Sequence, residues 1–131
     1  MARGWTWGEC MDQVLSLRPF VPARDFALSK RFYQALGFWL PHESGEIALL
    51  KTGSFSFILQ DFYNQELAEN LMVQLMVRDA DAWWRGVDAA ALVQEFGVRP
   101  PRASAVQPWG LKVGFPFDPA GVLRHVAEAP F

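Results

Sequence analysis

The sequence predicts an α+β fold made of two similar halves, because the same order of strand and helix signals occurs twice. Each half starts with an apolar extended run, passes an Arg-Asp pair (Arg24-Asp25 and Arg78-Asp79) into a helical pattern, and ends in short strands. A single β-α-β-β-β unit is too short to bury a full core. Two paired β-α-β-β-β modules are therefore expected to form one shared, cupped mixed sheet.

The first module is predicted over residues 14–63, after an N-terminal extension of residues 1–13. Residues 14–22 are apolar and extended. Asp25 stands where the N-cap of a helix belongs, and apolar residues then recur at helical spacing up to Gly37. Three strands follow, divided by Ser-Gly and Thr-Gly turn signals, at residues 38–40, 46–51 and 54–62.

The second module is predicted over residues 70–129, within a single domain of residues 14–131. Residues 71–77 alternate as a strand does. Asp79 or Asp81 can cap a helix that runs to about Ala91. A Pro-Pro turn and three more strands complete the module, with the strands at residues 96–98, 110–117 and 121–127.

Composition excludes several classes of function. The chain has 131 residues and a formal charge of −2, so it lacks the basic surface of a nucleic-acid-binding protein. Its single cysteine, Cys10, rules out an internal disulfide and a Cys-rich zinc site. No apolar run approaches the roughly 18 residues of a membrane helix, and the N-terminus lacks a signal-peptide core. A soluble cytoplasmic protein with no nucleic-acid or membrane partner is expected.

Sequence motifs in both halves resemble one known superfamily. In the first half these are the run from Arg18 to Asp25 and the pairs Phe32-Tyr33 and Gly37-Phe38; in the second they are the segments 77–84, 107–110 and 117–123. Together they are similar to the modules of the glyoxalase/bleomycin-resistance/dioxygenase superfamily, also called the vicinal oxygen chelate superfamily. The resemblance implies the paired-module fold, a ligand cavity and a homodimer.

The resemblance also implies four positions that hold a divalent metal in the metal-using members. In this chain they fall on Arg18, at or beside Gln60, near Met72 and on His125. A guanidinium cannot coordinate a metal, and a thioether does not suit Mg, Mn or Zn. Only Gln60 and His125 remain as possible ligands, so no metal and no cofactor are expected.

Binding residues can be predicted more readily than catalytic ones, since no nucleophile motif is present. His125 could contact a ligand or act as a base, or be an ordinary half-buried histidine. Arg18 could hold a carboxylate or phosphate, or pair with an acid such as Glu128. Trp109 lies in a Pro-Trp-Gly turn suited to the mouth of a pocket. The predicted ligand-binding residues are Arg18, Phe57, Gln60, Met72, Gln74, Trp83, Trp109 and His125.

These observations favour a metal-independent protein that binds a small organic molecule, as bleomycin-resistance proteins sequester a drug without modifying it. The alternative is a glyoxalase-type lyase or dioxygenase with a degenerate metal site. A third possibility is a dimeric scaffold protein in which the cavity has become part of the hydrophobic core and is filled by side chains. Whether the protein is an enzyme is left open, with binding favoured.

Overall fold

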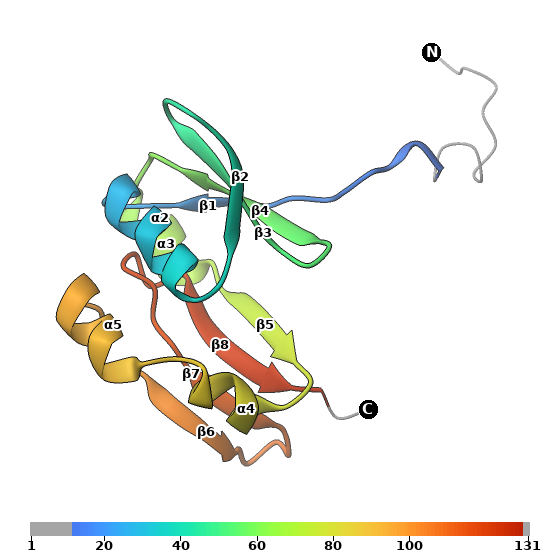
Figure 1. Ribbon diagram of the computed structural model, residues 1–131, viewed down its shortest axis with the longest axis vertical. Helices are drawn as coiled ribbons and strands as arrows, with labels where there is room; N and C mark the ends of the chain where they lie inside the picture. Colours follow the sequence, from blue (N-terminus) through green and yellow to red (C-terminus); the bar gives the residue numbers. More distant parts are fainter. Residues whose placement is uncertain (1–11, 130–131) are drawn as a thin grey trace.

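The computed structural model describes residues 12–129, which form two modules of the same topology (Figure 1). The first contains β1 (Phe20–Pro22), α2 (Phe26–Ala35), β2 (Trp39–Ser44), β3 (Ile47–Thr52) and β4 (Phe55–Gln60). A short helix, α3 (Gln65–Asn70), leads to the second module. The second contains β5 (Val73–Val77), α4 (Ala80–Arg85), α5 (Ala89–Phe96), β6 (Arg102–Val106), β7 (Lys112–Phe115) and β8 (Leu123–Glu128).

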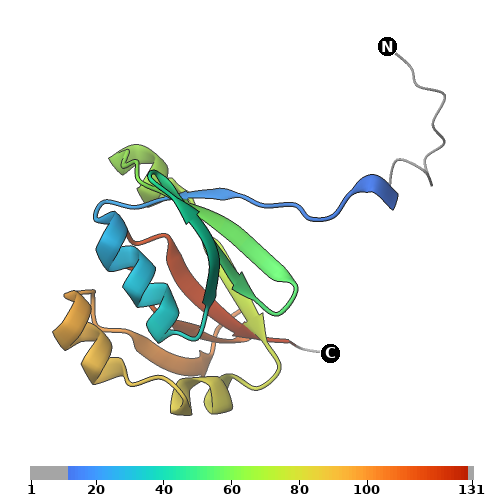
Figure 2. The ribbon, with the colours of Figure 1, turned by 45° about the horizontal axis from the view of Figure 1, so that its top comes forward.

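Each module builds its own four-stranded sheet, with strand orders β1-β4-β3-β2 and β5-β8-β7-β6. In both, the first strand pairs in parallel with the last strand, and the other pairings are antiparallel. The predicted α+β fold with two β-α-β-β-β modules is confirmed, although the modules do not share one hydrogen-bonded sheet. Helices α2 and α5 lie on the same side of the molecule (Figure 2).

The helices begin where aspartate side chains cap them. Asp25, Asp79 and Asp88 each accept a hydrogen bond from the backbone N–H three residues later, at 3.0–3.1 Å. The cap at Asp25 follows the sequence pattern, and of the two candidates for the second cap, Asp79 and Asp81, the structure has Asp79. The prediction of one helix reaching Ala91 is wrong, because the chain leaves α4 at Gly86 and Asp88 starts a new helix.

Three further elements differ from the sequence prediction. The strand predicted at residues 96–98 is absent, because Phe96 ends α5 and Gly97, at φ 62°, closes it. Strand β6 follows the Pro-Pro turn and was not predicted, since its small side chains show no apolar alternation. Helix α3 was also missed: it is largely polar, and the amide oxygen of Asn64 caps it.

The apolar run 14–22 pairs with the sheet only at its end. Residues Phe20–Pro22 align with Ile58–Gln60, whereas the preceding residues extend away from the domain (Figure 2). Two prolines in the run, Pro19 and Pro22, have no backbone N–H to contribute to a ladder. Most of the predicted extension, residues 1–11 with Cys10, lies outside the described residues.

A buried hydrogen bond joins the modules through the core. The Tyr33 hydroxyl of α2 donates to the carboxyl group of Asp118, which precedes β8. Asp118 also accepts from the backbone N–H groups of Val122 and Leu123, at 2.8 and 3.1 Å. Beside this contact, Phe32 packs edge-to-face on Phe96 with ring centroids 5.5 Å apart. Within residues 12–129 no helix has the length and apolar character needed to cross a membrane.

Candidate functional site

An apolar cavity of about 130 Å³ lies between the two modules. The first module contributes its side chains from β1, α2 and the β3–β4 hairpin, and the second contributes its side chains mainly from β5. All lining residues are uncharged at neutral pH. They are Pro19, Val21, Tyr33, Phe38, Thr52, Phe55, Ser56, Phe57, Val73, Gln74, Leu75 and Leu123.

Three aromatic rings form one wall of this cavity. Phe57 contacts Tyr33 and Phe38 with ring centroids 4.9 and 5.8 Å apart, in edge-to-face geometry. Such pairs hold each other in fixed orientations. Burial is the main cause that raises the pKa of Tyr33 well above its usual value, so its hydroxyl stays neutral on Asp118. The wall therefore offers rigid, neutral aromatic surface.

A polar pair adjoins the cavity at the edge strand β5. The side-chain amide nitrogen of Gln74 lies 3.1 Å from Nδ1 of His125, on the neighbouring strand β8. His125 is 8% exposed, and its ring packs edge-to-face on Phe115 at 5.8 Å. Desolvation lowers the pKa of His125 below its usual value, which keeps the ring neutral at pH 7.

The structure brings together some predicted site residues and separates others. Phe57 and Gln74 both line the cavity, and His125 contacts Gln74. Met72 is 53% exposed and precedes β5 on the same face as Gln74. Tyr33 was missed, although its place in the Phe-Tyr pair of the first helix was a usable signal.

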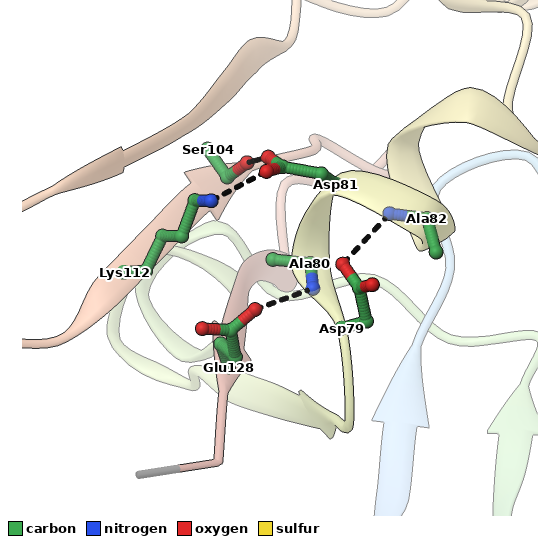
Figure 3. A network of polar contacts seen from close by, with 7 residues as sticks. All are labelled: Asp79, Ala80, Asp81, Ala82, Ser104, Lys112 and Glu128. Atoms are coloured by element: carbon green, nitrogen blue, oxygen red, sulfur yellow. Dashed lines mark hydrogen bonds and ion pairs between the residues drawn. The ribbon is translucent and has the colours of Figure 1, made fainter.

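Arg18 lies at the rim rather than in the lining. It is exposed, and its Nε donates to Ser56 Oγ at 3.1 Å. Glu128, weighed above as its partner, instead accepts a hydrogen bond from the backbone N–H of Ala80 at 3.1 Å (Figure 3). Nearby, Asp81 binds Lys112 at 2.5 Å.

Two predicted tryptophans lie away from the cavity lining. Trp109 is 60% exposed in the turn that closes at Gly110. Trp83, on α4, packs edge-to-face on Trp84 with centroids 5.1 Å apart. Trp84 packs so closely on Gly114 that a Cβ there would lie 2.4 Å from its Nε1. Ligand contacts by Trp83 and Trp109 stay predictions.

The two side chains that could still bind a metal belong to separate sheets. Gln60 ends β4, whereas His125 lies in β8. In the part of the chain that the structure describes, no three His, Cys, Asp or Glu side chains gather as a metal site would require.

Comparisons with known proteins show which solved structures share this fold. No family model matches the sequence, and no curated protein matches it. Solved structures of bleomycin-resistance and glyoxalase-related proteins share the fold, as the resemblance in the sequence implies.

Three of these structures illustrate the range of structural similarity and sequence identity. A bleomycin resistance determinant encoded on the transposon Tn5 superposes with a TM-score of 0.68 and 21% identity, over 88% of this chain and 98% of that one. A bleomycin-binding protein in complex with bleomycin gives 0.67 and 22%, over 87% and 98%. A lactoylglutathione lyase from Agrobacterium tumefaciens gives 0.61 and 18%, over 89% and 96%. At these identities the likeness establishes the fold.

Proposed function

We propose that this protein binds a small organic molecule in the cavity between its modules, without a metal ion. The observation that carries the proposal is a preformed cavity with apolar, aromatic and neutral polar walls. Ligand sites are commonly apolar clefts with a few placed polar groups. An open cavity also favours binding over a scaffold whose cavity has filled in.

The size of the cavity limits what enters it. A dry cavity of about 150 Å³ is large enough to hold benzene, and the cavity here measures about 130 Å³. The cavity is thus close to the size of one aromatic ring, and we propose that a group of this size occupies it. The remainder of a larger ligand would extend past Gln74 and His125, where polar groups and the exposed side chain of Met72 are available.

Drug sequestration is the nearest functional comparison. Two of the similar structures are described as a bleomycin resistance determinant and a bleomycin-binding protein in complex with bleomycin. For this chain we propose the same kind of event, namely reversible binding of an organic molecule without chemical change. The uncharged lining favours a neutral group in the cavity over an anionic one.

Fluorobenzene is a suitable probe, with ¹⁹F NMR as the readout in the presence of a chelator. The parent protein should broaden the fluorobenzene signal. Leu75→Phe should abolish the broadening because it fills the cavity. Val106→Phe enlarges a side chain that is 72% exposed and should leave the signal as in the parent. An unperturbed signal with the parent, or equal broadening by Leu75→Phe, would overturn the proposal.

The protein is also proposed to work as a homodimer. Among the described residues, Leu15 and Leu17 are 97% and 93% exposed on the extended segment before β1. Met72 and Met76 are about half exposed on one face of β5. Exposed apolar side chains are typical of surfaces that contact another protein, and we propose that a second copy of this chain covers them.

A further inference from the structure

Gln74 fixes which ring nitrogen of His125 carries the proton. Its amide nitrogen, Nε2, lies 3.1 Å from Nδ1 of His125. An amide nitrogen donates hydrogen bonds and does not accept them. Nδ1 must therefore accept, and a neutral ring then carries its proton on Nε2.

The protonated nitrogen is left available for a ligand. Among residues 12–129, Nε2 of His125 has no hydrogen-bond partner. In the described chain, the fully enclosed side-chain polar atoms without a hydrogen-bond partner are Ser29 Oγ and Trp84 Nε1. Nε2 of His125 is not one of them, so this atom is not fully enclosed. The small exposed fraction of His125, 8%, therefore includes this N–H group.

The surroundings make this donor selective. Phe115 packs against the ring on one side, at 5.8 Å, and Met72 and Met76 share the same face on the neighbouring strand. A ligand that displaces water here is favoured when it accepts this hydrogen bond, because a ligand that cannot do so leaves the donor without a partner. Gln74 is also one of the residues that line the cavity, so it links His125 to the cavity at strand β5.

We propose that His125 acts as a neutral hydrogen-bond donor, oriented by Gln74, which selects ligands that carry a carbonyl or similar acceptor next to an apolar ring. The selection rests on the proposed binding function, whereas the position of the proton does not. In a position where the superfamily resemblance implies a metal ligand, this chain would present an N–H group instead.

The position of the proton can be measured without any ligand. Only two histidines are present, His42 and His125, so ¹⁵N NMR of the rings, assigned with His42→Asn, reports the tautomer directly. The parent should show a protonated Nε2 and a bare Nδ1. Gln74→Glu places a carboxylate acceptor beside Nδ1, so Nδ1 should carry a proton in this variant, whether the ring is neutral or charged. Gln94→Glu, which makes the same change on an exposed position of α5, should leave the tautomer as in the parent. A protonated Nδ1 in the parent would overturn the proposal.

Acetophenone and α-methylstyrene test the selection, because they have nearly the same shape and differ in the carbonyl oxygen. The parent should bind acetophenone about three- to tenfold more tightly, the range expected for one hydrogen bond. His125→Phe removes the donor and should lose this preference, whereas Gln94→Glu should keep it. Equal binding of both probes by the parent overturns the selection and leaves the binding function standing. Binding of neither probe overturns the binding function, and the selection with it.

Discussion

At the scale of single residues, the contact between Gly114 and Trp84 shows how closely the second module is packed. The position of a Cβ at Gly114 would lie 2.4–2.7 Å from three atoms of the Trp84 indole. Overpacking of this kind costs about 1–3 kcal/mol. Gly114→Ala should therefore lower the free energy of unfolding by that amount in urea titrations.

Gly45→Ala provides the matched control. Nothing lies within 4 Å of a Cβ at Gly45, and its backbone does not require a glycine. The control should be neutral or stabilising by up to about 1 kcal/mol, because alanine restricts the unfolded chain. Trp84→Phe in the Gly114→Ala background should recover part of the loss. An equal effect of both alanine substitutions would contradict this account of the packing.

Asp118 should give the protein a particular dependence of stability on pH. Burial is the main cause that raises the pKa of Asp118 above its ordinary value of 3.8. The folded chain then holds this proton more tightly than the unfolded chain does. The free energy of unfolding should fall as pH rises from about 4 through the raised pKa, since the folded state must release the proton.

Asp118→Asn removes this titration, and urea unfolding of both proteins from about pH 4 to about pH 7 measures the difference. The stability of the parent relative to the variant should decrease as pH rises. A difference that increases with pH would show that the hydrogen bonds to the carboxylate outweigh its burial, and a constant difference would show that the two effects cancel; either result would contradict the prediction.

At the scale of elements, the helix starts could be predicted because their signals are local. Asp25 and Asp79 accept backbone N–H groups three residues later, as the pattern requires. Strand β6 and helix α3 could not be predicted in this way, since their side chains carry little apolar periodicity and their pairing depends on distant segments. The break between α4 and α5 was missed although Gly86 and Asp88 marked it.

The same distinction holds for the candidate site. Phe57, Gln74 and His125 could be chosen from strand alternation and from the superfamily resemblance. The distance between Gln74 and His125 could not, because it depends on an irregular register in which Gln74 pairs with His125 directly after Val73 pairs with Leu123. Tyr33 enters the cavity only because the two modules meet there.

The cap of α2 can be tested by itself. Asp25 Oδ1 accepts from the backbone N–H of Leu28 at 3.1 Å. Asp25→Ala should lower the free energy of unfolding by about 0.5–2 kcal/mol, whereas Asp25→Asn retains an oxygen acceptor and should cost much less. Chemical denaturation measures both. Equal losses would mean that the charge, rather than the capping hydrogen bond, stabilises this helix.

At the scale of the whole molecule, two open sheets and an exposed apolar segment predict self-association. Sedimentation equilibrium at micromolar concentration should give twice the chain mass of 14.8 kDa. Leu15→Glu with Leu17→Glu should shift the mass toward the monomer, because the two leucines are almost fully exposed in the single chain. Ser16→Glu adds charge to the same segment and should shift the mass less. A monomeric parent would contradict the proposed dimer.

The central claim is that a ring-sized organic group occupies the cavity between the modules without a metal. Crystals grown from chelator-treated protein and soaked with bromobenzene test it directly, because anomalous scattering locates the bromine. The account predicts a bromine peak among Tyr33, Phe57 and Leu75 in crystals that contain no bound metal. An empty cavity, with bromine found only at other surfaces, would contradict it.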